Sequence, residues 1–199
     1  MSAILLDSFK FKNSSFFFDE NAQSLRKAFK MPIVFCSTKL SKLTGLKTRL
    51  PSLSMDNWNG HLFALQGRKC LVFVHKETFY SFVIFDILKR QLIDFKQVFT
   101  DNFIKQLEHD NLLSDDLKHS IVKDFQNLEF STTDGDKLTI GYLNDCIARL
   151  TWERNGRPPT IDETKIYVEN YYNENPLISR KGITPKELMN DKLKNYAQQ

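Results

Sequence analysis

DNWNGHLFALQGRKCLVFVHKETFYSFVIFDI, which runs from Asp56 to Ile87, is the densest apolar segment of the chain. Turn-forming residues at Gly67-Arg68 and Lys76–Thr78 divide it into three strand-like runs. Because a parallel crossover needs a dozen residues or more, spacers this short predict antiparallel neighbours, and hence a three-stranded meander over residues 61–86. The middle run is apolar at every position from Leu71 to Val74, so we expect it to be covered on both faces.

The segments around the meander predict a further strand and a set of helices. The β-rich run at 32–36 indicates a strand, and Leu128–Thr132 is a second, short candidate. Apolar residues spaced by three or four, often behind a capping residue, predict helices at 91–111, 114–125, 137–155, and in shorter stretches after 38, 160 and 184. We therefore predict an α+β fold in which a small, mainly antiparallel sheet is packed with four or five helices.

The 199 residues suffice for one domain with an appendage. Residues 1–30 differ in pattern from the rest, and a methionine followed by a short β-rich run is a common domain start. We predict an N-terminal extension at 1–30 and a single domain at 31–199. The chain has 17 Phe against 2 Trp and 6 Tyr, which predicts a core filled by aromatic rings.

Cysteine usage and hydropathy indicate a cytoplasmic protein. The three cysteines are far apart and form no CxxC pair, a pattern typical of reduced proteins. No run approaches the roughly 18 apolar residues that a membrane span needs, so we expect no membrane partner. The N-terminus lacks a basic region before its short apolar patch, and we therefore reject a signal peptide.

Positive charge is concentrated near the N-terminus. Residues 1–60 hold nine Lys and Arg against four Asp and Glu, whereas the remainder of the chain has a net charge of −1. A nucleic-acid surface is one interpretation, and its residues are Lys39, Lys42, Lys47 and Arg49. The alternative, which we favour at this modest excess, is an ordinary solvated face.

Several chemistries lack the residues they need. His75-Lys76-Glu77 has the HxE spacing of zinc deaminases, but no PCxxC follows it, and a turn with surface residues is the better interpretation. Asp134-Gly135-Asp136 lacks the other ligands of a calcium loop and is expected to be a turn that caps the next helix. His61, His109 and His119 are isolated and none pairs at i, i+4 with another ligand type, so we predict no metal site. No phosphate-binding loop or nucleophile elbow occurs either, and we predict no cofactor.

Polar residues at the ends of the meander are the candidate binding residues. Strand-end loops commonly carry binding side chains, and an adjacent polar pair on a helix often binds a neighbouring loop. The candidates are Trp58, Arg68, Lys69, Thr78, Asn144 and Asp145. For Trp58 the alternative is that it covers the sheet, and for Asn144-Asp145 it is a structural role.

Four blocks of sequence resemble a family of uncharacterised bacterial proteins that is catalogued as a domain of unknown function. They are MPIVFCSTKLSKLTGL, then Trp58 with GRKCLVFVHKETFYSF, then TTDGDKLTIGYLND at 132–145 and NENPLISRKGITPKELM at 173–189. The resemblance covers residues 31–189 and implies a soluble bacterial protein without an established activity. Members tend to carry a basic residue before the LGxxND block, where this chain has Asp136-Lys137.

These observations leave three functions open. The first is a non-enzymatic binding or interaction module, with a protein partner or a second copy of the chain as possible partners. The second is an enzyme acting on a phosphodiester or nucleotide through Arg68, Lys69 and Asp145, which requires Arg68, Asn144 and Asp145 to converge on one pocket. The third is nucleic-acid binding through the basic segment 39–49.

Overall fold

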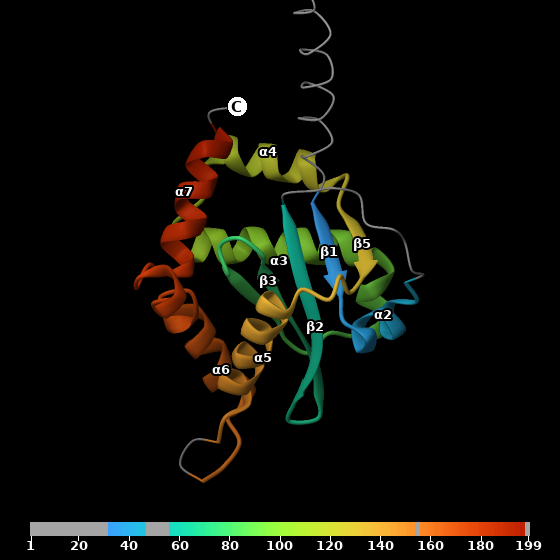
Figure 1. Ribbon diagram of the computed structural model, residues 1–199. Helices are drawn as coiled ribbons and strands as arrows, with labels where there is room; N and C mark the ends of the chain where they lie inside the picture. Colours follow the sequence, from blue (N-terminus) through green and yellow to red (C-terminus); the bar gives the residue numbers. More distant parts are fainter. Residues whose placement is uncertain (1–31, 47–55, 154–155, 198–199) are drawn as a thin grey trace, which may run out of the picture.

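A five-stranded sheet with helices on both faces forms the centre of the molecule (Figure 1). The structure is a computed structural model, and it describes residues 32–46, 56–153 and 156–197. The strands are β1 (Ile33–Cys36), β2 (Asn57–Leu65), β3 (Arg68–His75), β4 (Ser81–Ile84) and β5 (Glu129–Thr132). Their order across the sheet is β4-β3-β2-β1-β5. The predicted extension at 1–30 lies outside the described residues.

The predicted meander is present. β2, β3 and β4 pair antiparallel in sequence order. Gln66 and Gly67 form the first hairpin turn with φ values of 49° and 74°, the left-handed pair that matches strand twist, one residue earlier than expected. From Cys70 to His75 every β3 residue is buried, so this strand is covered on both faces as predicted.

The expectation of a mainly antiparallel sheet was wrong, because the sheet is mixed. β1 pairs in parallel with β2 on one side and with β5 on the other. Short spacers dictate antiparallel pairing only within the meander. The connection from β1 to β2 spans residues 37–56, which is long enough for a parallel crossover.

Helices cover both faces of the sheet, and the described residues contain six α-helices where four or five were expected. One face is packed by α2 (Thr38–Thr44), α3 (Phe95–His109), α4 (Asp115–Phe125) and α7 (Pro185–Ala197). The other face is packed by α5 (Lys137–Thr151), α6 (Ile161–Tyr167) and its π-helical continuation η2 (Val168–Tyr172). Two short 3-10 segments, η1 (Lys89–Asp94) and η3 (Ile178–Arg180), lie in the connections.

Aromatic rings fill the core between the sheet and α3. Trp58 packs edge-to-face on Phe103 with ring centroids 4.9 Å apart, and Phe73 packs edge-to-face on Phe99 at 4.8 Å. Such pairs contribute about 0.5–1.5 kcal/mol each beyond the burial of their area. None of the helices in the described part of the chain is long and apolar enough to cross a bilayer.

Candidate functional site

A crevice of about 280 Å³ opens where β1 and β5 end. One wall comes from the segment after β1, which contributes Thr38, Ser41, Lys42 and Leu46. The other wall comes from the end of β5, with Thr132 and Thr133. The lining is therefore rich in hydroxyl groups and carries one ammonium group.

The topology of the sheet explains why the crevice lies here. β1 and β5 are adjacent and parallel, so their carboxyl ends lie at the same edge of the sheet. The helix after β1, α2, packs on the Trp58 face through Leu40, whereas the helix after β5, α5, packs on the opposite face through Leu143. Two connections that leave in opposite directions separate the strand ends, and open α/β sheets bind ligands at such switch points.

Local hydrogen bonds hold the first wall in place. Ser37 caps α2 by accepting a hydrogen bond from the Leu40 backbone N–H at 3.4 Å, and Gly45 ends the helix in the left-handed region at φ 69°. Ser41 Oγ donates to the Cys36 carbonyl at 3.2 Å. The Ser41 hydroxyl is therefore tied to the end of β1.

An internal ion cluster fixes the second wall. Asp136 caps α5 by accepting from the Leu138 N–H at 3.2 Å and from Thr139 Oγ1 at 2.7 Å, so the predicted capping turn is confirmed. Lys76 Nζ lies 2.5 Å from Asp134 Oδ2 and 3.1 Å from Asp136 Oδ2. Burial alone lowers the pKa of Lys76, but the hydrogen bonds and charges of the two carboxylates outweigh it and raise the pKa. Lys76 thus offsets one of the two negative charges of this turn.

The charge left at the crevice is positive. Lys42 lines it, and Lys39 lies one turn earlier on the same short helix; both are exposed. Neither forms an ion pair with any residue that the structure describes. Burial and the Lys39 charge together lower the pKa of His61 on β2, which keeps that imidazole neutral. Lys47 and Arg49 lie outside the described residues.

Cys36, at the base of the crevice, is not a nucleophile. Burial raises the pKa of its thiol to about 12, so the thiolate that would attack a substrate is scarcely populated at neutral pH. The crevice therefore presents donors and one cation without an activated nucleophile.

Two of the predicted site residues, Trp58 and Thr78, are buried. The Trp58 ring is 1% exposed, and its Nε1 has no hydrogen-bond partner among the described residues. Thr78 Oγ1 lies 2.9 Å from His75 Nδ1 inside the turn that follows β3. These side chains belong to the packing of the sheet.

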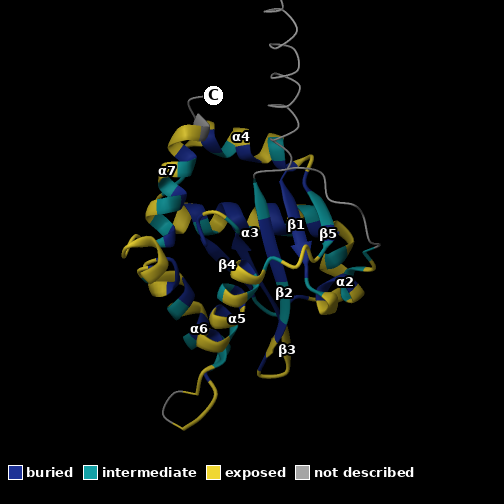
Figure 2. Cartoon of the chain, in the orientation of Figure 1, coloured by how far each residue is buried: buried dark blue, intermediate teal, exposed yellow. Residues whose placement is uncertain are grey.

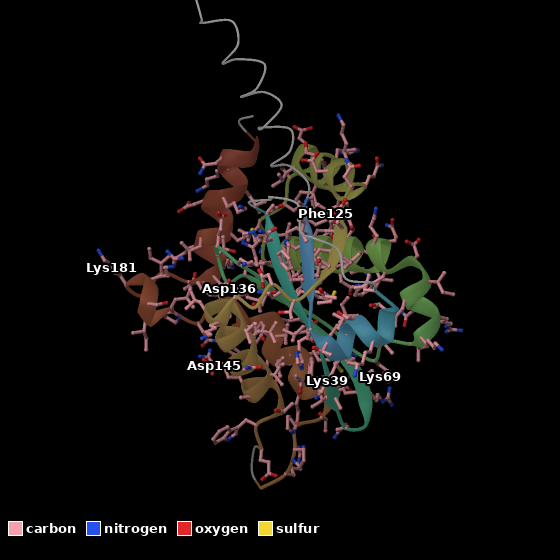
Figure 3. All side chains as sticks on the ribbon, turned by 45° about the vertical axis from the view of Figure 1, so that its right-hand side comes forward. Lys39, Lys69, Phe125, Asp136, Asp145 and Lys181 are labelled. Atoms are coloured by element: carbon pink, nitrogen blue, oxygen red, sulfur yellow. The ribbon has the colours of Figure 1, made fainter. Side chains whose placement is uncertain are left out.

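The other predicted residues lie on the surface. Arg68 forms an ion pair with Asp86 across the end of the meander, and Lys69 is exposed. Asn144 and Asp145 are exposed on α5, and no hydrogen bond or ion pair in the described regions joins either of them to Arg68. Figure 3 shows Lys69 on β3 well apart from Asp145 on α5.

The interpretation of His75 as a surface residue was wrong. Its side chain is fully buried, and the Trp58 ring packs edge-on against it with ring centroids 5.0 Å apart. The Thr78 backbone N–H donates to Nδ1, which leaves Nε2–H to donate to Asp56 Oδ1 at 3.0 Å. Burial raises the pKa of Asp56, but His75 and the nearby Lys192 ammonium outweigh it and lower the pKa.

This Thr78–His75–Asp56 row has the residue types of a hydrolytic triad without its accessibility. Thr78 is 4% exposed, and its Oγ1 also accepts a hydrogen bond from the Tyr80 backbone N–H at 3.2 Å. A nucleophilic hydroxyl has to face its substrate. These three residues hold the turn after β3 in place by hydrogen bonds. They were not recognised as a group from the sequence, and the HxxT spacing of His75 and Thr78 is the signal that could have revealed them.

Comparison with known proteins gives a family and no further relatives. Residues 33–188 match the family described as Domain of unknown function (DUF6933), as the resemblance in sequence indicated, and the chain belongs to this family. No curated protein and no solved structure matches the chain.

Proposed function

We propose that this member of the DUF6933 family is a binding module that holds a small anionic ligand, such as a phosphate monoester, in the crevice between α2 and the β5–α5 loop. The observation that carries the proposal is the divergence of α2 and α5 from the adjacent carboxyl ends of β1 and β5. This geometry leaves the loops free to bind while the sheet holds them in fixed positions.

The chemistry of the walls supports an anionic ligand. Hydroxyl groups of Thr38, Thr132 and Thr133 are hydrogen-bond donors, and Lys42 supplies a positive charge. Because Lys76 offsets one of the two charges at Asp134 and Asp136, this turn repels an anion less than two free carboxylates would. At about 280 Å³ the crevice is slightly below the usual size of a drug-like site, which favours a small ligand.

The same lining supports binding rather than catalysis. Proton transfer in enzymes is most often carried by an imidazole or a carboxylate, and neither is among the described residues that line the crevice. Cys36 is held protonated by burial. Hydroxyls and an ammonium group are sufficient to bind and orient an anion.

A titration tests the proposal. We expect inorganic phosphate or adenosine monophosphate, added to ¹⁵N-labelled protein, to shift the amide resonances of Thr38–Leu46 and Thr132–Thr133. Lys42→Glu should weaken binding by about tenfold or more, because a charge-assisted hydrogen bond contributes about 1.5–3 kcal/mol. Lys105→Glu is the matched control, since Lys105 is an exposed lysine on α3 without an ion pair in the described structure. Equal effects of the two variants, or no shifts at the crevice, would contradict the proposal.

Nucleic-acid binding is the second candidate, favoured by two exposed lysines on α2 that form no ion pair with another described residue. A single-stranded oligonucleotide in the same titration distinguishes nucleic-acid binding from binding of a small anion. If the protein binds nucleic acid, the affinity should fall steeply with salt, and Lys39→Glu should reduce it as much as Lys42→Glu does. If the ligand is held in the crevice, Lys42→Glu should reduce the affinity more than Lys39→Glu, because Lys42 and not Lys39 lines the crevice.

A further inference from the structure

Lys76 fixes the loop that forms the second wall of the crevice from a distant part of the chain. It lies in the turn after β3, 58 residues before Asp134, and its Nζ is 2.5 Å from Asp134 Oδ2 and 3.1 Å from Asp136 Oδ2. The Lys76 backbone N–H donates to the Asn57 carbonyl at 2.8 Å, which ties the lysine to the start of β2. The loop between β5 and α5 is therefore anchored to β2 and β3.

Lys76 and the crevice lie on opposite faces of the sheet. Successive side chains of a strand point to opposite faces, so Phe35 and Cys36 of β1 lie on different sides. Cys36 lines the crevice and belongs to the core on the α3 side. The Lys76 ammonium instead covers the Phe35 ring, 5.4 Å from its centroid. The ion pair with Lys76 therefore draws the Asp134 carboxylate away from the face on which the crevice opens.

Asp134 directly follows the wall of the crevice in the chain. Thr133 lines the crevice, and Figure 2 shows that the loop between β5 and α5 is largely exposed. The Asp134 side chain is nevertheless only 15% exposed, and its Oδ2 is the oxygen that Lys76 binds. A carboxylate released from Lys76 is thus one residue from the crevice, on a loop that leaves room for it to turn.

We propose that Lys76 is a positioning residue for the crevice, which holds the Asp134 carboxylate on the opposite face of the sheet and so keeps it out of the anion site. This inference rests on the proposed function and adds how that site is kept free of a competing charge. Once released, the Asp134 carboxylate accepts hydrogen bonds from the same hydroxyl and ammonium groups as a phosphate does. It also repels a phosphate, because like charges placed together in a site oppose binding.

Asp136 is the matched comparison, because its carboxylate binds the same ammonium group but is held differently. Without Lys76, Asp136 keeps hydrogen bonds from the Leu138 N–H at 3.2 Å and from Thr139 Oγ1 at 2.7 Å. Asp134 keeps one exposed hydrogen bond, which its Oδ1 accepts from the Asp136 N–H at 3.1 Å. Loss of Lys76 should therefore release Asp134 and leave Asp136 in place at the start of α5, where Figure 3 shows it.

Titration of inorganic phosphate into a set of ¹⁵N-labelled variants tests the inference. Lys76→Met keeps an apolar chain over Phe35 and removes the charge, and it should raise the dissociation constant for phosphate about tenfold or more. Lys76→Met/Asp134→Asn should restore the wild-type constant to within about twofold, because the neutral amide does not repel the anion. Lys76→Met/Asp136→Asn has the same net charge and keeps a capping side chain, and it should bind as weakly as Lys76→Met.

A control variant removes a lysine from an ion pair elsewhere. Lys118 is paired with Glu108 at 2.6 Å, and Lys118→Met should leave the dissociation constant for phosphate unchanged. A loss of affinity in this variant as large as in Lys76→Met would overturn the inference.

The outcomes separate this inference from the proposed function. If the wild type does not bind phosphate, the proposed function fails and the role of Lys76 fails with it. If the wild type binds and Lys76→Met binds equally well, only the role of Lys76 is overturned. Equal recovery in both asparagine variants would show that net charge controls binding, and recovery in neither would show that Lys76 only supports the fold. A Lys76→Met protein whose amide spectrum is that of an unfolded chain would likewise make Lys76 a stability residue and overturn the inference.

Discussion

The two halves of the sheet are built differently. In the antiparallel half, β2, β3 and β4 are consecutive in the chain and are joined by tight turns, and β3 is buried on both faces. In the parallel half, β1 and β5 come from distant parts of the chain, and three of the four β5 residues are only half-buried. Local connections make a close-packed scaffold, whereas long connections leave their loops at one edge, where a crevice forms.

The outer edges of the two halves also differ. β4 is an edge strand, and the Asn173 side chain binds both the backbone N–H and the carbonyl of Ser81 at 2.9 Å. This amide takes the place of a neighbouring strand and closes part of the edge. Asp110 accepts hydrogen bonds from Tyr80 and from Asn173, which ties the same edge to the end of α3. The antiparallel half is therefore fixed by polar contacts as well as by packing.

The largest expected difference between the halves is in the cost of removing a buried ring. Phe73→Ala in β3 should lower the free energy of unfolding by about 3–5 kcal/mol, because the ring packs between Phe82 and Phe99 and leaves a cavity that cannot collapse. Phe35→Ala in β1 should cost less, because no aromatic ring of the described residues packs on Phe35, and its ring is covered instead by the Lys76 ammonium 5.4 Å from the ring centroid. Urea denaturation of both variants measures the difference, and equal costs would show that the halves are equally well packed.

Gly60 tests the junction between the halves, because it pairs with Cys36 in β1 and with Phe73 in β3. A Cβ at this position would lie 2.7 Å from the Phe73 ring and 3.2 Å from Leu40. Gly60→Ala should therefore cost about 1–3 kcal/mol through overpacking. Gly141→Ala on α5 is the matched control, since its Cβ meets nothing and alanine favours the helix by about 0.8–1 kcal/mol. Thermal melts at low concentration should show opposite signs, and a neutral Gly60→Ala would mean that Phe73 moves freely.

The contrast between the antiparallel and parallel halves also explains which features of the structure could be predicted from the sequence. The meander, the strand at Ile33–Cys36 and most of the helices follow from turns and periodicity, which are local properties. The parallel pairing of Cys36 with Thr132 joins residues far apart in the chain, and a short apolar run does not specify its neighbours. The crevice could not be predicted for that reason, although Lys42 was a candidate. The burial of Trp58 likewise depends on α3 and α7, whose Phe103 and Met189 pack with it from elsewhere in the sequence.

A smaller effect is expected at the loop that joins the parallel half to α5. Asp136→Ala removes the cap of α5 and one partner of Lys76, and should cost about 1 kcal/mol at neutral pH. Burial raises the pKa of Asp136, but the Thr139 hydroxyl and the Lys76 ammonium outweigh it and lower the pKa below 3.8. A carboxylate with a lowered folded-state pKa contributes its full stabilisation above the unfolded value of 3.8 and loses it as the pH falls through the folded value. The stability difference between wild type and variant should therefore be constant near neutral pH and shrink in acid, and chemical denaturation at several pH values measures it. A difference that persists in strong acid would show that the carboxylate charge is not the source of the stabilisation.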